Sequence, residues 1–110
     1  MFSQEYYMKR IHDVKFQIQS IRLNIGFEKI KQRSVHTNRM FYLEHMDKWV
    51  QQIKAHHYTQ EKEDRLINQL IEKYSHYRFL DEDFQSDISF QEGQVAALEF
   101  ELEHLKNNLE

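Results

Sequence analysis

Hydrophobic residues in the second half of the chain recur at alternating intervals of three and four positions. This spacing runs from Ile67 to Leu109 and is interrupted only by Asp81 and Gln91. Its apolar members are Ile67, Leu70, Tyr74, Tyr77, Phe84, Ile88, Val95, Leu98, Leu102, Leu105 and Leu109. A three-four spacing held this long places every member on one narrow stripe of a helix, which is the seam of a coiled coil.

The first half of the chain carries a heptad of its own. Its apolar members are Tyr7, Ile11, Val14, Ile18, Ile21, Ile25, Val35, Tyr42, Met46, Trp49 and Ile53. Glu28, Gln32 and Arg39 fall on the same spacing, so this seam also contains polar positions. The pattern predicts one helix over about residues 3–57 and a second over about residues 60–107.

Two segments weaken this helical interpretation. Residues 33–38 include Ser34, Thr37 and Asn38, whose side chains can hydrogen-bond the backbone and are mediocre helix formers. We therefore expect a kink or a short break there. The acidic segment 81–87 is a second candidate break, at which a separate helix could begin.

A turn is expected at about residues 58–60, near the middle of the chain. Thr59 can cap the following helix, and Glu61 and Glu63 would lie in its first turn, where their charges complement the helix dipole. Folding the chain back here sets the polar positions of the two seams level with each other. These are Glu28, Gln32 and Arg39 on one side and Asp81 and Gln91 on the other. Their coincidence predicts an antiparallel hairpin with a polar waist, which would either fix the alignment of the helices or act as a hinge.

The composition agrees with long helices and few turns. The 110 residues include no Pro and only two Gly, Gly26 and Gly93, whereas a β-rich domain needs both residue types for its many turns. We expect a single all-α domain over residues 1–110. Its architecture would be a long, coiled-coil-like antiparallel helical hairpin, completed by packing with partner helices.

Each expected helix has a second apolar stripe on its outer side. The two stripes comprise Phe16, Leu23, Phe27 and Ile30 in the first half and Phe90, Gly93, Ala97 and Phe100 in the second. A helix that is apolar on two faces is normally buried on two faces, and a lone hairpin buries only one. Exposed apolar patches of this size are uncommon on monomers. The outer stripes are therefore the candidate partner-binding residues.

Charge and composition exclude several other classes of partner. The formal charge is −3 with both signs mixed along the chain, which gives no field suited to phosphate backbones, so we expect no nucleic-acid partner. No apolar run approaches the roughly 20 residues that span a bilayer, and residues 1–5 lack the features of a secretory signal. We expect a cytoplasmic protein without membrane insertion, or one exported with a partner by a route that needs no signal peptide.

The sequence offers little to build a catalytic or metal site. Glu101 and His104 have the i, i+3 spacing of di-iron bundles, but those sites need two such motifs and further carboxylates. Glu72 and His76 lie one turn apart without companions. There is no Cys, no phosphate-binding Gly loop and no zincin or nucleophile-elbow motif. We expect no metal, no cofactor and no enzymatic activity.

An aromatic residue is followed by an acid four positions later in two overlapping places. These candidate export-type pairs are Tyr77 with Asp81 and Phe79 with Asp83. In size, hairpin layout and these pairs, the chain resembles the small helical-hairpin proteins of Gram-positive type VII secretion. These include the W-x-G hairpin family and the small targeting partners of LXG toxins. The W-x-G tripeptide itself is absent, since Trp49 is followed by Val50 and Gln51.

The resemblance implies a targeting chaperone that packs beside the helical domain of a secreted toxin and presents it to the secretion machinery. Our first hypothesis is therefore a non-enzymatic helical adaptor that forms a hetero-complex with helical partners. One alternative is a self-assembling homodimeric coiled coil or four-helix bundle with a structural or regulatory role. Another is a compact four-helix monomer of phage or regulatory type, with its helices broken at residues 33–38 and 81–87.

Overall fold

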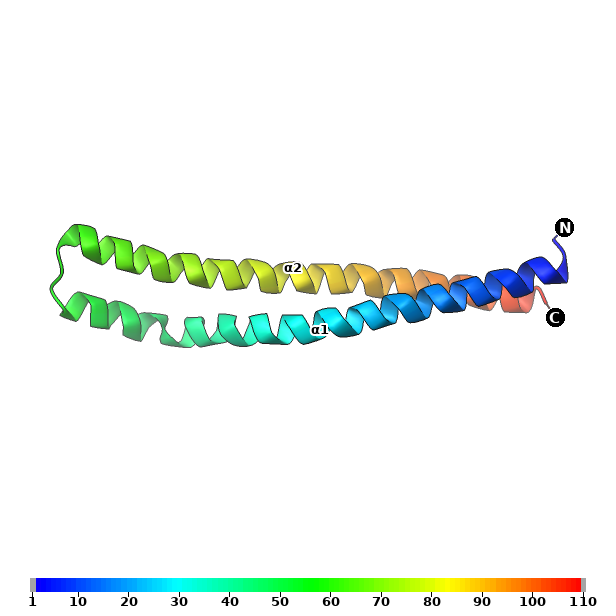
Figure 1. The fold of residues 1–110 in the computed structure, drawn as a ribbon, viewed down its shortest axis with the longest axis horizontal. Coiled ribbons are helices and arrows are strands. Elements are labelled where there is room, and N and C mark those ends of the chain that lie inside the picture. Colours follow the sequence, from blue (N-terminus) through cyan, green and yellow to red (C-terminus); the bar gives the residue numbers. More distant parts are fainter. Residues whose placement is uncertain (1, 110) are drawn as a thin grey trace. The chain divides into compact units, whose positions relative to one another are not determined.

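The protein consists of two α-helices joined by a short turn in a computed structural model that describes residues 2–109 (Figure 1). Helix α1 spans Gln4–Ala55 and helix α2 spans Gln60–Asn107. These bounds lie within two residues of those expected from the heptads. The two helices pair antiparallel and no strand forms between residues 2 and 109, so the predicted all-α helical hairpin is confirmed.

Both helices contribute to two compact units. The first unit contains the described residues up to Lys29 together with those from Ser86 onward, and the second unit contains Ile30–Gln85. The second unit therefore includes the turn, and the first includes the start of α1 and the end of α2. Each unit is described separately below.

The apolar core of the first unit is made by the predicted seam. Its buried side chains are Val14, Ile18 and Ile25 from α1 and Ile88, Val95 and Leu105 from α2. Partly buried seam residues pack against them, namely Tyr7, Ile11, Ile21, Leu98 and Leu102. All eleven fall on the three-four spacing, because this spacing keeps one side of each helix turned toward the other.

The interior of the second unit is richer in aromatic and polar side chains. Tyr42 of α1 stacks on Tyr77 of α2 with ring centroids 5.5 Å apart. Tyr42 also meets the edge of Trp49 at 5.5 Å. These half-buried rings occupy predicted seam positions, so the seam extends through this unit as well.

Neither helix is broken at the two candidate segments. Both 33–38 and 81–87 are continuous α-helix, so the alternative of four short helices does not hold. The hydroxyl of Thr37 donates to the backbone carbonyl of Arg33, at 2.9 Å, which leaves the helical backbone bonds in place. Contacts of the seam residues on either side outweigh the weak intrinsic preference of this segment.

The turn between the helices combines an N-cap on α2 with one residue in the left-handed backbone conformation. The Oγ1 atom of Thr59 accepts a hydrogen bond from the backbone N–H of Lys62 at 3.3 Å, which confirms Thr59 as the N-cap of α2. His57 closes α1 with a φ of 53°, a conformation usually left to Gly at this position of a helix end. Its backbone N–H donates to the carbonyl of Lys54 at 3.3 Å.

Candidate functional site

Both helices of the first unit carry exposed side chains without charge, some beside the groove between the helices and some opposite the seam. We call this set the uncharged face. It is made by Phe16, Gln17, Ser20, Leu23, Asn24 and Phe27 of α1 and by Phe90, Gly93, Gln94, Ala97 and Phe100 of α2. The five large apolar side chains among them are between 57% and 79% exposed. Charged side chains flank this set, since Asp87 is exposed three residues before Phe90, and Glu101, one turn after Ala97, pairs with Arg10 at 2.8 Å.

A groove runs between the two helices on the uncharged face. It has a volume of about 540 Å³ and is lined by Phe16, Gln17, Ser20, Ile21, Gln94, Ala97 and Leu98. Ile21 and Leu98 are seam residues, so they form its floor. Ser20 and Ala97 are small, which lets a visiting side chain approach the seam. The groove is a concave site that suits a bulky apolar group.

The opposite side of the same unit is charged. Arg22 of α1 pairs with Glu99 of α2, and Lys29 pairs with Glu92 at 3.4 Å. A smaller groove there is lined by Lys15, Ile18, Gln19, Arg22, Glu99 and Leu102. We call this side the ion-pair face. Since exposed ion pairs are well solvated, this side is suited to water, whereas the uncharged face is suited to contact with another apolar surface.

The predicted partner-binding residues are all exposed, and all but one lie in the first unit. The exception is Ile30, which is 63% exposed but belongs to the second unit. The exposed surface of the second unit is charged along both helices. Its exposed charged residues include Glu44, Asp47, Lys48, Lys54, Glu61, Lys62, Arg65 and Glu72. The uncharged face is therefore confined to one unit.

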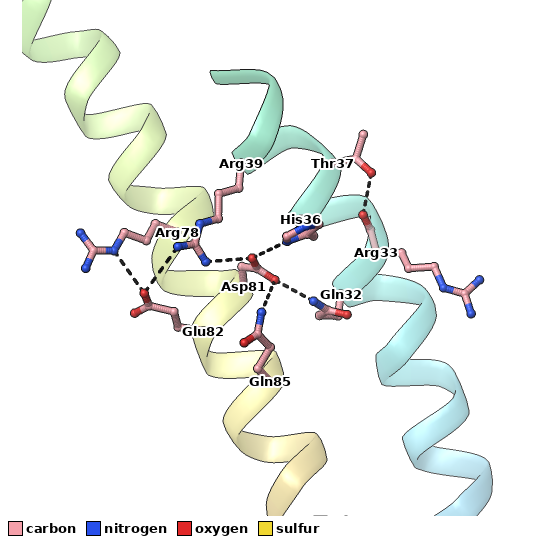
Figure 2. Close-up of polar contacts among 9 residues, drawn as sticks. All are labelled: Gln32, Arg33, His36, Thr37, Arg39, Arg78, Asp81, Glu82 and Gln85. Carbon is pink, nitrogen blue, oxygen red and sulfur yellow. Dashed lines mark hydrogen bonds and ion pairs between the residues drawn. The ribbon is translucent and has the colours of Figure 1, made fainter. Parts of the chain in front are cut away.

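The polar waist consists of two clusters, one in each unit. In the second unit the carboxylate of Asp81 has no exposed surface and receives side-chain donors from both helices. Figure 2 shows this carboxylate directed from α2 toward α1. The distances from its oxygens are 2.8 Å to Gln32 Nε2, 2.8 Å to His36 Nδ1 and 3.0 Å to Arg39 Nη1. Gln85 of α2 itself donates to the same carboxylate, at 3.3 Å.

These contacts determine the protonation of Asp81. Burial raises its pKa, but the hydrogen bonds from His36, Gln32 and Arg39 together lower it more, and the pKa settles at about 2. The carboxylate is therefore charged at neutral pH, and the His36 nitrogen that faces it must carry the donated proton. Arg39 balances the charge, and its Nη2 also lies 3.8 Å from Glu82 Oε1.

The second cluster lies in the first unit around the buried side chain of Gln91. Its Oε1 accepts from Asn24 Nδ2 at 2.7 Å, and its Nε2 donates to Glu28 Oε2 at 2.9 Å and to Asp87 Oδ2 at 3.2 Å. The proximity of Asp87 raises the pKa of Glu28 above its ordinary value. The amide of Gln91 thus bridges two carboxylates that would otherwise repel each other.

Sequence reasoning identified the central residues of both clusters but missed the flanking ones. His36 and Asn24 were not predicted, because each lies beside the seam and not on the three-four spacing. His36 also fell inside the segment expected to break. Each of them is adjacent in sequence to a seam residue, since His36 follows Val35 and Asn24 precedes Ile25. A polar residue next to the seam, level with an Asp or Gln in the opposite seam, is the signal that could have found them.

The candidate export-type pairs differ in accessibility. Tyr77 stacks on Tyr42 and Asp81 is fully buried, so the first pair is held between the helices. In the second pair, Phe79 is 67% exposed and Asp83 is exposed. A receptor could therefore reach the second pair without separating the helices, but not the first.

The candidate metal-ligand pairs lie in different units. Glu101 forms an ion pair with Arg10 across the helices at 2.8 Å. Glu72 and His76 lie beside Tyr42 and Tyr77 in a shallow groove on the second unit. Among residues 2–109, no three His, Asp or Glu side chains are gathered so that they could hold a metal ion.

Two further findings bear on the class of protein. Within the described part of the chain, neither helix contains a stretch apolar enough to cross a lipid bilayer. No protein-family model matches the chain, and no curated protein or solved structure is significantly similar to it.

Proposed function

We propose that this protein is a non-enzymatic helical adaptor that binds the helical domain of another protein through the uncharged face. The observation that carries the proposal is the exposure of five large apolar side chains in one unit, namely Phe16, Leu23, Phe27, Phe90 and Phe100. Leaving large apolar side chains in water costs free energy that a partner surface would recover, at about 25 cal/mol for each Å² covered.

The division of the first unit into two faces supports binding on one side. Charged pairs such as Arg22 with Glu99 remain on the ion-pair face, where a bound apolar partner would have to strip their water. Only uncharged groups, such as Gln17 and Gln94, border the groove on the other face. A helix with large apolar residues at intervals of three and four would fit there, in the helix-in-groove mode of recognition.

The resemblance to targeting partners of type VII secretion suggests which class of partner to test first. That class is the helical domain of a secreted toxin, for which this chain would act as a chaperone that shields an apolar helical surface. The proposed setting rests on the resemblance in size and layout. The adaptor activity itself rests on the uncharged face and would apply to other helical partners.

The test is coexpression of the chain with the helical domain of a toxin encoded beside it, followed by size-exclusion chromatography with light scattering. We expect a defined hetero-complex. Replacement of Phe27 and Phe100 by Glu should abolish the complex while the helical circular dichroism stays unchanged. Loss of helicity in this double variant would mean that the two residues are core, which would overturn the proposal.

A matched control is available in the second unit. Phe41 and Phe79 are also exposed, at 49% and 67%, and also lie one on each helix. The double variant Phe41→Glu with Phe79→Glu should keep the hetero-complex. If both double variants lose it equally, binding does not depend on the uncharged face and the proposal is wrong.

A further inference from the structure

We infer that the polar cluster around Asp81 selects one register of α1 against α2 in the second unit from several that the apolar seam alone would allow. This Asp81 cluster consists of Gln32, His36 and Arg39 of α1 and Asp81 and Gln85 of α2 (Figure 2). The inference does not rest on the proposed function, because neither the uncharged face nor a partner enters it.

The apolar seam of the second unit is compatible with more than one register. Its apolar members recur at intervals of three and four in both helices, namely Val35, Tyr42, Met46, Trp49 and Ile53 in α1 and Ile67, Leu70, Tyr74, Tyr77 and Phe84 in α2. Sliding α1 along α2 by one heptad, which is about 10 Å, again sets seam positions against seam positions. Since hydrophobic burial is not directional, the apolar side chains distinguish such registers only weakly.

The carboxylate of Asp81 distinguishes the registers strongly. It has no exposed surface, and it is charged because its pKa is held at about 2. Four side-chain donors reach its two oxygens, which is about as many as a carboxylate accepts. Three of the four come from α1. A charged carboxylate that lost these donors inside the hairpin would be strongly destabilising.

The three donors of α1 are available in the observed register and not in its heptad neighbours. They occupy positions 32, 36 and 39, which form one stripe of the helix. After a shift by seven residues in one direction, Asp81 would face Arg39, Leu43 and Met46. After the same shift in the other direction, it would face Ile25, Lys29 and Gln32. Each shifted set offers fewer donor side chains than the observed one, so the buried carboxylate favours the observed register.

The register can be measured as a distance between two spin labels. The chain has no Cys, so labels on two introduced cysteines would stand at known positions. Lys48→Cys and Asp83→Cys are suitable, because both residues are exposed and lie in the second unit. Asp83 follows Asp81 by two residues and is therefore level with the α1 residues of the cluster. Since Lys48 is displaced from that level along the helix, a shift by one heptad changes the label distance by up to about 10 Å.

The experiment compares two variants in which the turn no longer restricts sliding. About seven flexible Gly and Ser residues are inserted between His57 and Tyr58 in every chain, including the parent. The cluster variant carries Gln32→Leu, Arg39→Leu and Asp81→Leu. The matched control is Tyr42→Leu with Tyr77→Leu, which removes the aromatic stack from the same seam and leaves the Asp81 cluster in place.

Double electron–electron resonance should give one label distance in the parent and in the aromatic control. In the cluster variant we expect additional distances displaced by up to about 10 Å, with the shifted population at least about tenfold larger than in the parent. The helical circular dichroism of the cluster variant should stay unchanged, and its denaturation midpoint should equal or exceed that of the parent. Replacing a buried ion pair by apolar side chains is often neutral or stabilising.

Three results would overturn the inference. A single, unshifted distance in the cluster variant would show that the apolar seam selects the register by itself. An equal spread of distances in the aromatic control would show that the Asp81 cluster has no special part in the selection. Loss of helical content in the cluster variant would show that the cluster is needed for the hairpin to form at all.

Discussion

The guanidinium of Arg39 and the carboxylate of Asp81 lie 3.0 Å apart across the two helices, and the carboxylate has no exposed surface. A charged pair inside a helical hairpin is a weak source of net stability, because both groups lose water when they are buried. Removing one partner is different, since the other charge is then left without compensation. The pair therefore constrains which alignments of α1 and α2 are tolerated more than it strengthens the hairpin.

Substitution of Asp81 should accordingly be strongly destabilising. We expect Asp81→Ala to lower the free energy of unfolding by about 3 kcal/mol, the magnitude typical of breaking a buried ion pair. Chemical denaturation followed by circular dichroism measures this change. Glu82→Ala is the matched control, because Glu82 is exposed and its ion pairs are solvated, so its effect should stay below about 0.5 kcal/mol. Equal effects of the two variants would contradict the role assigned to Asp81.

Acid should weaken the hairpin over a defined range of pH. The pKa of Asp81 is lowered from 3.8 to about 2 in the folded chain, so the unfolded chain takes up the proton first. The corresponding stability is fully present above about pH 4 and is lost as the pH falls toward 2. We expect the melting temperature to fall over this range and the fall to be reduced in Asp81→Asn. An identical acid profile in that variant would show that other groups control the transition.

The raised pKa of Glu28 gives the stability of the hairpin the opposite dependence on pH. Because the folded chain holds this proton more tightly than the unfolded chain, Glu28 favours folding as the pH drops through its raised pKa toward 4.5. We expect Glu28→Gln to remove this gain, which stability curves measured above pH 4.5 would show. Asp87→Asn should have the same effect, since the Asp87 carboxylate causes the shift. If Asp87→Asn leaves the gain in place, the assigned cause is incorrect.

The start of α2 should depend on one hydroxyl group. We expect Thr59→Ala to destabilise the hairpin by about 1 kcal/mol, because it removes the cap on the Lys62 N–H. Thr59→Ser should retain most of the stability. Thr37→Ala serves as control, since the Thr37 hydroxyl bonds back to a carbonyl inside a continuous helix, and Ala is the better helix former. In thermal unfolding, the melting temperature of Thr59→Ala should be lower than that of the wild type. The melting temperature of Thr37→Ala should equal or exceed that of the wild type.

Most of the fold could be predicted from the sequence because one repeating constraint governs it. Every seam residue from Tyr7 to Ile53 and from Ile67 to Leu109 is buried or partly buried, since the three-four spacing reports directly which side of a helix faces its partner. The same logic set Glu28, Gln32 and Arg39 level with Asp81 and Gln91, but it did not assign individual pairs. The turn was found because capping by Thr59 is a local property of the sequence.

The errors arose where local and tertiary effects compete. Residues 33–38 have poor helix propensity, yet α1 continues through them because its seam side is held against α2. His36 escaped prediction because its contact with Asp81 comes from beside the seam, and the position of such side chains depends on the separation of the helices. The extent of the uncharged face was also only partly foreseen. Its stripes were recognised, whereas the sequence alone did not show that the uncharged Gln17 and Gln94 line one groove.

Most residues of the uncharged face are not those that hold the hairpin together, although Asn24 belongs to both sets through its bond to Gln91. Ile18 and Val95 are buried between the helices, whereas Leu23 and Ala97 are exposed. Most substitutions on the face should therefore leave the fold intact. Related chains can then differ in what they bind while they keep the same backbone, and duplicated copies could acquire different partners while each remains folded.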